Sequence, residues 1–258
     1  MAKTFLITGV SSGFGRALAQ AALRDGHIVV GTVRKESDKA DFEQLGQGAH
    51  AVILDVTDTA RIAPAVAAIE NDIGAIDVLV NNAGYGHEGI LEESSIDDLR
   101  RQFEVNVFGA VAMIQAVLPA MRKRRAGHIL NITSMGGIIT LPGLSYYHGS
   151  KFALEGISET LGKEVKDLGI HVTAIEPGGF RTDWAGRSMV RAARSIADYD
   201  ALIEPIRKRR LEASGWQIGG WMEDRGELVG IAFVDAVEIV RDQAFDGGSV
   251  VAHGICSG

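Results

Sequence analysis

Cysteine is almost missing from the sequence, since Cys256 is the only one in 258 residues. One cysteine cannot form a disulfide within the chain, which excludes a disulfide-stapled fold and fits a reducing compartment. Long apolar runs are also scarce, and we find none that approaches the ~18 uncharged residues of a membrane-spanning helix. The N-terminal apolar run, residues 5–7, passes directly into a glycine-rich loop, which does not predict a signal peptide. We therefore expect a cytoplasmic protein with no membrane partner.

Positive charge is in deficit, with 26 Lys and Arg against 33 Asp and Glu and a net charge of −7. A protein with this net negative charge is not expected to bind nucleic acid or an anionic membrane. Two short basic runs, 122–125 and 207–210, lie at the end of one predicted helix and on a second, and no aromatic residues are interleaved with them. We expect no nucleic-acid partner.

Hydrophobic residues make up 46% of the chain, which is enough for a large core. Six runs rich in Val, Ile and Leu alternate with stretches of helical periodicity. Because most of these runs lack strict alternation, they predict strands that are covered on both faces, as in a parallel sheet. The pattern predicts one α/β domain over residues 1–258, a Rossmann-type doubly wound sheet in three layers. The expected strands are 4–10, 27–33, 50–56, 76–82, 128–134 and 171–177, and the clearest helical stretches are 16–26, 59–74 and 96–125.

The regular order ends after Pro177. Residues 178–220 are polar, lack strand signals and have helical spacing at 198–213, so they are open to two interpretations, a substrate lid or an ordinary surface helix. The C-terminal part, 211–258, is divergent: 215–226 has no clear pattern, and 244–254 is a candidate for the last strand.

A glycine-rich loop, Gly9-x-x-x-Gly13-x-Gly15, lies between the first predicted strand and the first predicted helix. Glycines allow the backbone to approach a pyrophosphate closely, and the following helix offers free N–H groups and the positive end of its dipole. The alternative is a tight turn without a ligand. We predict that this loop, including Ser11, Ser12 and Phe14, binds a dinucleotide.

The end of the second predicted strand indicates which nicotinamide cofactor is bound. Val33 stands where an acidic residue would bind the ribose 2′-hydroxyl of NAD, and Arg34 and Lys35 follow it. A guanidinium suits a 2′-phosphate, whereas Glu36 lies too far along to compete. NADP is therefore favoured over NAD, the alternative being that both cations are solvated loop charges.

The segment YYHGSK places Lys151 four residues after Tyr147 and five after Tyr146. On a helix, residues four apart share a face, so Lys151 is expected beside Tyr147 and away from Tyr146. An ammonium favours the phenolate, so we expect it to lower the pKa of Tyr147 and make this side chain a proton donor and acceptor. Tyr146 is then a packing residue or part of a substrate wall.

Ser134 precedes Tyr147 by 13 residues and ends the fifth predicted strand. Its hydroxyl could hydrogen-bond a substrate carbonyl, or could simply cap a helix or loop. The glycine spacing, Ser134, Tyr147 and Lys151 together resemble the short-chain dehydrogenase/reductase family, and the resemblance extends over roughly residues 4–186. It implies a catalytic role for Asn106, which interrupts a predicted helix and would help hold a water near the lysine.

The resemblance also implies contacts to the cofactor from several strand ends. Asp55 and Val56 would contact adenine, although Asp55 could also be a turn residue, and the segment from Asn82 would lie beside the cofactor. With the glycine loop and Arg34, the predicted cofactor-binding set is Gly9, Ser11, Ser12, Gly13, Phe14, Gly15, Arg34, Asp55, Val56, Asn82, Ala83, Gly84, Tyr147, Lys151, Pro177, Gly178 and Thr182.

The family resemblance implies hydride transfer between NADP(H) and a ketone, an aldehyde or a secondary alcohol. Ser134 would steady the carbonyl oxygen, Tyr147 would deliver the proton, and Lys151 would bind the nicotinamide ribose. No metal is expected, since the sequence has no Cys/His cluster. Two alternatives remain at this point, a non-catalytic NADP-binding sensor or scaffold and a dehydratase or epimerase.

The resemblance further implies a homodimer or homotetramer. Four apolar residues suggest an apolar lid over the substrate, which the sequence does not identify: Phe180, Trp184, Met189 and Val190. His87 and His148 are interpreted as polar wall residues flanking the site.

Overall fold

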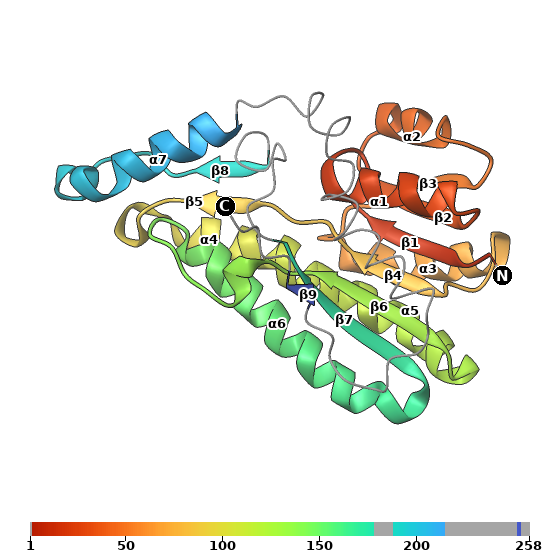
Figure 1. Ribbon diagram of the computed structural model, residues 1–258. Helices are drawn as coiled ribbons and strands as arrows, with labels where there is room; N and C mark the ends of the chain where they lie inside the picture. The colour runs from red at the N-terminus through yellow and green to blue at the C-terminus, as the bar shows by residue number, and fades with distance from the viewer. Residues whose placement is uncertain (1, 178–187, 215–251, 254–258) are drawn as a thin grey trace.

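The computed structural model describes residues 2–177, 188–214 and 252–253. Its main sheet has seven strands in the order β3-β2-β1-β4-β6-β7-β9, and all neighbouring pairs are parallel (Figure 1). The order reverses between β1 and β4, which is where open sheets of this kind bind ligands. The strands are β1 (Thr4–Thr8), β2 (Ile28–Val33), β3 (Ala49–Ile53), β4 (Val78–Asn81), β6 (Gly127–Ile132), β7 (Ile170–Glu176) and β9 (Ala252–His253).

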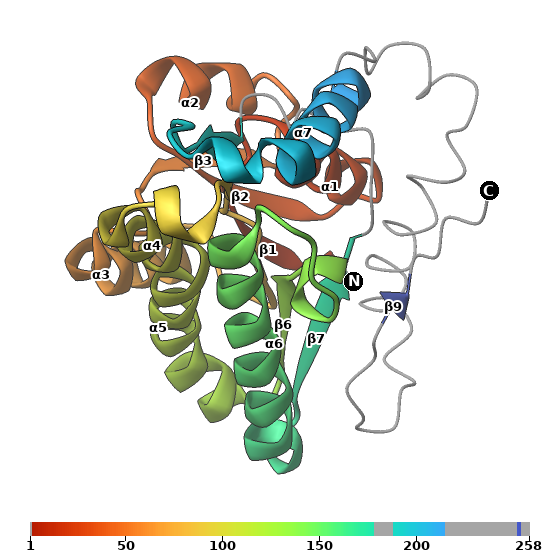
Figure 2. The same cartoon turned by 90° about the vertical axis from the view of Figure 1, so that its left-hand side faces the viewer.

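Helices cover both faces of the sheet and give three layers (Figures 1 and 2). Helices α1 (Gly13–Arg24) and α2 (Glu36–Glu43) pack on one face, while α3 (Thr59–Asp72), α5 (Gly109–Arg124) and α6 (Ser145–Val165) pack on the other. The doubly wound α/β fold expected from the sequence is confirmed.

Strand β1 shows why the apolar runs form this sheet. All five of its residues are buried, with Phe5 and Ile7 in the core cluster on one face and Leu6 in the cluster on the other. A strand that is apolar on both sides is stable only between two layers of helices. Each such side chain stabilises the fold by about 1.5–3 kcal/mol relative to its exposed state.

The stretch Ile96–Arg124 is long and apolar enough to cross a membrane by length and composition, contrary to what we expected from the sequence. It consists of α4 (Ile96–Phe103), a π-helical turn (Glu104–Phe108) and α5. Met113, Val117 and Met121 are fully buried in the core. The core helix of a doubly wound domain can have the same length and apolar composition, so this finding is weak evidence for a membrane span.

A second, two-stranded sheet lies at the end of the main sheet where its parallel strands terminate (Figure 1). Strand β5 (Gly86–Glu88) pairs in parallel with β8 (Met189–Arg191), which is followed by α7 (Asp200–Ser214). The sequence predicted no strand between residues 178 and 220. That prediction is wrong, because three residues are too few for a periodic signal and β8 depends on its distant partner.

The other predictions for the C-terminal part have mixed outcomes. Helix α7 confirms the helical spacing seen at 198–213, and β9 is a strand within the candidate region 244–254. Residues 178–187 and 215–251 lie outside the described part of the chain, as do 254–258 with Cys256.

Candidate active site

The glycine loop has the geometry of a phosphate cradle. Gly9 and Gly13 have φ of +74° and +61°, a region that favours glycine. A Cβ on Gly15 would lie 2.4 Å from both the Gly9 carbonyl oxygen and Asn82 Nδ2, whereas a Cβ on Gly13 would meet no described atom within 4 Å. The loop is thus closely packed against Asn82 at Gly15 and open at Gly13. Helix α1 begins at Gly13 with no capping bond from the Ser12 side chain, so its N-terminus fits an anionic pyrophosphate.

The segment after β4 fastens this loop to the sheet. Asn82 Nδ2 donates to the carbonyl oxygens of Thr8 (2.8 Å) and Gly9 (3.0 Å). Thr8 Oγ1 accepts hydrogen bonds from the backbone N–H groups of Asn82 (3.0 Å) and Ala83 (2.9 Å). Asn82 and Ala83 therefore shape the cradle from below. Sequence reasoning missed Thr8 as the acceptor, because its partners lie more than 70 residues away.

Arg34 and Asp55 follow β2 and β3 at the same edge of the sheet. Arg34 is exposed, as a contact to a 2′-phosphate requires, and Val56 is buried. Asp55 Oδ1 accepts hydrogen bonds from Thr57 N (2.9 Å) and Thr57 Oγ1 (2.8 Å). Asp55 thus serves as a turn residue, the alternative noted from the sequence, and its contact to adenine stays a prediction.

Helix α6 brings Tyr147 and Lys151 together as predicted. Lys151 Nζ lies 5.9 Å from the centroid of the Tyr147 ring and donates to the Ile132 carbonyl oxygen at 2.8 Å. Tyr146 points elsewhere: its hydroxyl donates to the Ser94 carbonyl oxygen at 3.0 Å. Of the two neighbouring tyrosines, only Tyr147 shares a face with the lysine.

The pKa of Tyr147 differs from the expectation. Burial raises this pKa, and a hydrogen bond with Ser134 opposes the rise only in part. Burial has the opposite effect on Lys151: it lowers the pKa of this side chain to about 8, although the charge of Glu155 acts to raise it. The predicted lowering of the Tyr147 pKa by Lys151 is therefore wrong for the protein alone, because desolvation of the phenol outweighs the other effects.

Ser134 has the capping role considered for it, and its bond to a substrate carbonyl stays a prediction. Its Oγ accepts a hydrogen bond from Gly136 N at 3.0 Å and so caps the short 3₁₀ turn Met135–Gly137, two residues after β6. The same hydroxyl is hydrogen-bonded to Tyr147. The cap holds the serine hydroxyl in place beside the phenol, as a site for a carbonyl oxygen requires.

His148 fixes the loop that follows Ser134. Its Nε2 accepts from Leu141 N at 2.8 Å, so the ring hydrogen lies on Nδ1, which donates to the Gly136 carbonyl oxygen at 2.7 Å. His148 is buried, with 4% of its surface exposed. Sequence reasoning treated it as a wall residue, because nothing local signals these two backbone partners.

Asn106 lies in the π-helical turn, the irregularity that its presence in a helix predicted. Its Nδ2 donates to the Tyr85 carbonyl oxygen (3.0 Å) and to Ser150 Oγ (3.1 Å), and its Oδ1 accepts from Tyr85 N (3.1 Å). A Cβ on Gly84 would lie 3.2 Å from Asn106 Oδ1 and 3.8 Å from Lys151 Nζ. Asn106 and Lys151 are therefore neighbours across Gly84.

The remaining predicted residues are only partly described. The Pro177 carbonyl oxygen accepts from Met135 N at 3.1 Å, which places the proline beside the loop after Ser134. Met189 is buried with Leu144 and Tyr147 in a small apolar cluster, and Val190 is exposed. Gly178, Phe180, Thr182 and Trp184 lie outside the described residues.

His87 is buried on β5 behind Tyr146, and their ring centroids are 5.0 Å apart. Burial lowers the pKa of His87, so the ring is neutral at pH 7, although Asp98 Oδ2 lies 3.9 Å from its Nε2. His87 therefore contributes packing rather than charge to this side of the site.

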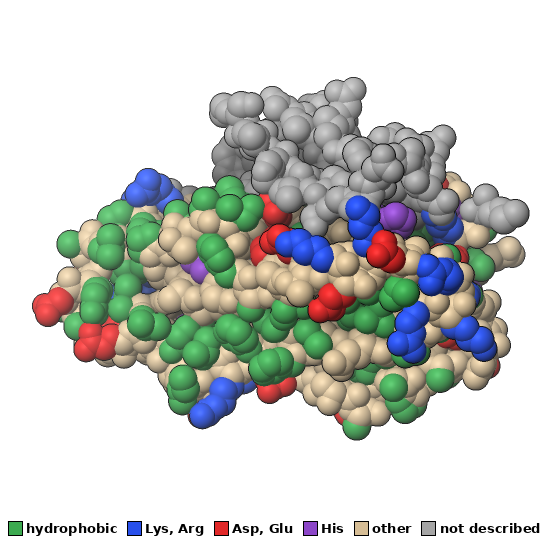
Figure 3. Space-filling model, turned by 90° about the horizontal axis from the view of Figure 1, so that it is seen from below, with side chains coloured by type: hydrophobic (Ala, Val, Ile, Leu, Met, Phe, Trp, Pro, Cys, Tyr) green, Lys and Arg blue, Asp and Glu red, His purple; other side chains and the backbone are tan. Residues whose placement is uncertain are grey.

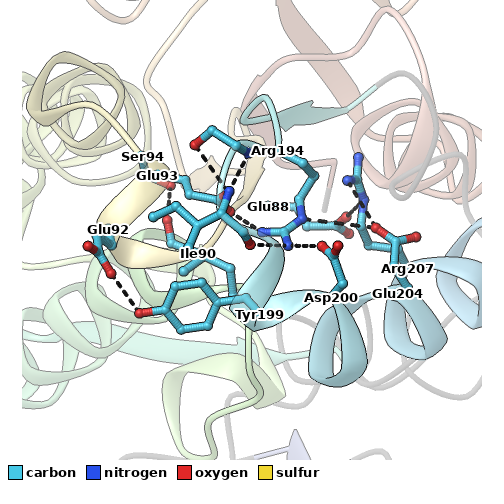
Figure 4. Close-up of polar contacts among 12 residues, drawn as sticks. Glu88, Ile90, Glu92, Glu93, Ser94, Arg194, Tyr199, Asp200, Glu204 and Arg207 are labelled. Carbon is cyan, nitrogen blue, oxygen red and sulfur yellow. Dashed lines mark hydrogen bonds and ion pairs between the residues drawn. The ribbon is translucent and has the colours of Figure 1, made fainter.

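A polar network fastens β8 and α7 to the segment around β5 (Figure 4). The buried Glu93 carboxylate accepts from Ser195 N (2.6 Å) and Ile196 N (2.7 Å) and pairs with Arg194. In a second group, Oε1 of the buried Glu88 lies 3.3 Å from Arg207 Nε and 3.5 Å from Arg191 Nε. Other members of the network are Glu92 with Tyr199, and Asp200 and Glu204 with Arg194.

Comparison with known proteins shows the family of the chain. Residues 3–191 match the family model described as short chain dehydrogenase. A 3-ketodihydrosphingosine reductase from Bacteroides thetaiotaomicron is 45% identical over 204 residues, which cover 78% of this chain and 74% of the relative.

Solved structures show the same family. A short-chain dehydrogenase from Streptomyces avermitilis superposes with a TM-score of 0.83 at 36% identity, covering 98% of this chain and 89% of the other. A gluconate 5-dehydrogenase from Burkholderia cenocepacia J2315, solved with NADP and tartrate, gives a TM-score of 0.75 at 26% identity and covers 98% and 94%. The chain therefore belongs to the short-chain dehydrogenase family and is an oxidoreductase acting on CH–OH or C=O groups.

Proposed function

We propose that this protein is an NADP(H)-dependent oxidoreductase that interconverts a ketone or aldehyde with the corresponding alcohol. The observation that carries the proposal is the meeting of Ser134, Tyr147 and Lys151 beside a glycine cradle at the switch point of the sheet. When bound in this cradle, the dinucleotide would supply or accept the hydride. A sensor or scaffold would need the cradle alone.

The protein's own side chains handle the carbonyl oxygen and its proton. Ser134, oriented by its hydrogen bond from Gly136 N, donates to the substrate oxygen as negative charge develops there. Tyr147 transfers its hydroxyl proton to that oxygen during reduction and takes it back during oxidation. Lys151 binds the ribose and restores the proton of Tyr147, and Asn106 fixes the backbone of Tyr85 beside it.

The preference for NADP rests on Arg34. Its exposed guanidinium directly follows β2 and can pair with a 2′-phosphate, and the neighbouring Lys35 adds charge of the same sign. The gluconate 5-dehydrogenase structure holds NADP. We expect Arg34→Ala to raise the Kd for NADPH at least tenfold while changing the Kd for NADH little, with Arg24→Ala as the control. Equal loss of both affinities would contradict this assignment.

The substrate that we propose is a ketone with an extended apolar part. The loop after Ser134 exposes large apolar side chains, with Met135 at 41%, Ile138 at 48% and Leu141 at 47%. Apolar surface beside a catalytic residue favours an apolar ligand over water. The Bacteroides relative is named as a 3-ketodihydrosphingosine reductase.

A panel of 2- and 3-keto compounds of increasing chain length tests the function directly. NADPH consumption is followed at saturating cofactor, and we expect kcat/KM to rise with chain length. Wild-type protein that binds NADPH but turns over neither these ketones nor the matching alcohols would favour the sensor. Turnover that does not depend on chain length would support the proposed reaction but contradict the proposed apolar substrate.

We also propose that the protein is a homo-oligomer assembled through α5 and α6. Hydrophobic side chains gather on the outer face seen in Figure 3, and a groove between the two helices is lined by Ile114, Leu118, Phe152 and Ile157. A second copy placing the same helices there would bury this surface with two-fold symmetry.

A further inference from the structure

A third titratable side chain follows Tyr147 and Lys151 along α6. Glu155 lies one helical turn after Lys151, so the three share a face. Its stem passes beneath the turn after Ser134, because a Cβ on Gly137 would lie 2.9 Å from Glu155 Cγ. Among the described residues, Glu155 Oε1 is buried without a hydrogen-bond partner. Burying a carboxyl oxygen without a hydrogen-bond partner costs free energy, so the presence of this side chain calls for an explanation.

The neighbouring Thr133 also acts on Glu155. Thr133 Oγ1 donates to the Ile175 carbonyl oxygen at 2.8 Å, and the same hydroxyl lowers the pKa of Glu155. Among the described residues, Oε1 of Glu155 still has no hydrogen-bond partner.

The surrounding charges act on Glu155 in both directions. Burial raises its pKa most, and Glu176 on β7 and Glu159 on α6 raise it further, whereas the charge of Lys151 lowers it. The Thr133 hydroxyl lowers this pKa as well. Glu176 is itself only 6% exposed, so water screens its charge little.

We propose that Glu155 is a positioning residue that acts through Lys151: its partly buried carboxylate, one helical turn further along α6, keeps the lysine protonated. Burial lowers the pKa of Lys151 to about 8 even with the opposing effect of the Glu155 charge. Without this charge the lysine would lose its proton at a lower pH.

Glu155→Gln tests the proposal, because the amide keeps the shape of the carboxyl but never ionises. The kinetic readout rests on the proposed function. We expect kcat/KM at pH 6.5 to change less than twofold, while the alkaline limb moves to lower pH by about one unit. Glu159→Gln, at an exposed position one turn further along α6, is the matched control and should leave the limb in place. An unchanged limb, or equal loss at every pH, overturns the proposal.

Unfolding by urea without cofactor tests the same idea independently of any activity. A carboxyl whose pKa is raised in the folded state stabilises the protein below its unfolded pKa, and this contribution is lost as pH rises through the folded pKa. The wild-type protein should therefore lose stability relative to Glu155→Gln as pH rises above the unfolded pKa of about 4.3. A difference that stays constant with pH would show a packing role only and would overturn the proposal, whether or not the proposed function holds.

Discussion

Tyr147 and Lys151 are each 7% exposed, and burial favours the neutral form of both. In the proposed mechanism, neutral Tyr147 is the acid that carbonyl reduction consumes. A neutral Lys151 could not pair with a developing phenolate. Under this mechanism the protein alone is prepared to give a proton, and the lysine sets its alkaline limit.

Tyr147→Phe should remove this proton and little else. We expect kcat to fall by at least about 10²-fold, in line with the loss of a general acid, while the Kd for NADPH stays within twofold. Tyr146→Phe loses only the hydrogen bond to the Ser94 carbonyl oxygen and should keep most of the turnover. Turnover above a few per cent in the Tyr147 variant would assign the acid elsewhere.

The lowered pKa of Lys151 predicts a pH limit. Below about pH 8 the ammonium is present, and as pH rises through this value the charge that pairs with the ribose and the phenolate is lost. We therefore expect kcat/KM to decline above about pH 8, two units earlier than an exposed lysine would allow. Initial rates between pH 6 and pH 10 measure the limb, and a flat profile to pH 10 would contradict it.

At the scale of elements, β5, β8 and α7 form a wall whose attachment is mainly polar. Hydrogen bonds from the backbone N–H groups of Ser195 and Ile196, together with the charge of Arg194, lower the pKa of Glu93. Such a carboxylate stabilises the folded state above its unfolded pKa, and this contribution is lost as pH falls through the lowered folded value. The wall should therefore remain attached at neutral pH and loosen in acid.

Glu93→Gln should loosen this wall at neutral pH. Both backbone donors bind Oε1, which the amide keeps, but the amide loses the negative charge and replaces the Oε2 that pairs with Arg194 by an NH₂ group. We expect faster hydrogen exchange at 189–200 and a raised KM for the ketone, with the Kd for NADPH unchanged. Glu92→Gln, which alters only the exposed contact with Tyr199, is the control. Unchanged exchange in the Glu93 variant would show that apolar packing holds the wall.

Elements with a clear period could be predicted from the sequence, and those without one could not. Strands β1 to β4, β6 and β7 and the long helices gave sustained patterns, whereas β8 has three residues and α2 buries only Phe42. The spacing of Tyr147 and Lys151 gave their common face correctly. The pKa of Tyr147 was predicted wrongly, since burial is a property of the folded chain. The hydrogen bonds of Thr8 were missed because their partners are distant in sequence, and Glu155 was missed because the burial of its carboxyl has no sequence signal.

At the scale of the whole molecule, the apolar groove between α5 and α6 predicts association. Ile157→Arg would place a charge in the groove, and its desolvation on assembly should convert the proposed oligomer into monomers. Sedimentation velocity at micromolar concentration measures this change. Lys163→Gln, at an exposed position on the same helix, should leave the assembly intact. A wild-type monomer would contradict the proposed interface.

The π-helical turn at Glu104–Phe108 sets a limit on how this protein can be made more heat-resistant. Deleting one residue there would join α4 and α5 into one regular helix, a change that favours the isolated helix. It would also remove the wide turn from which the Asn106 carboxamide reaches Tyr85 and Ser150. Thermal tolerance gained by regularising this helix would thus be obtained at the expense of catalysis, and adaptation to heat should leave the turn alone.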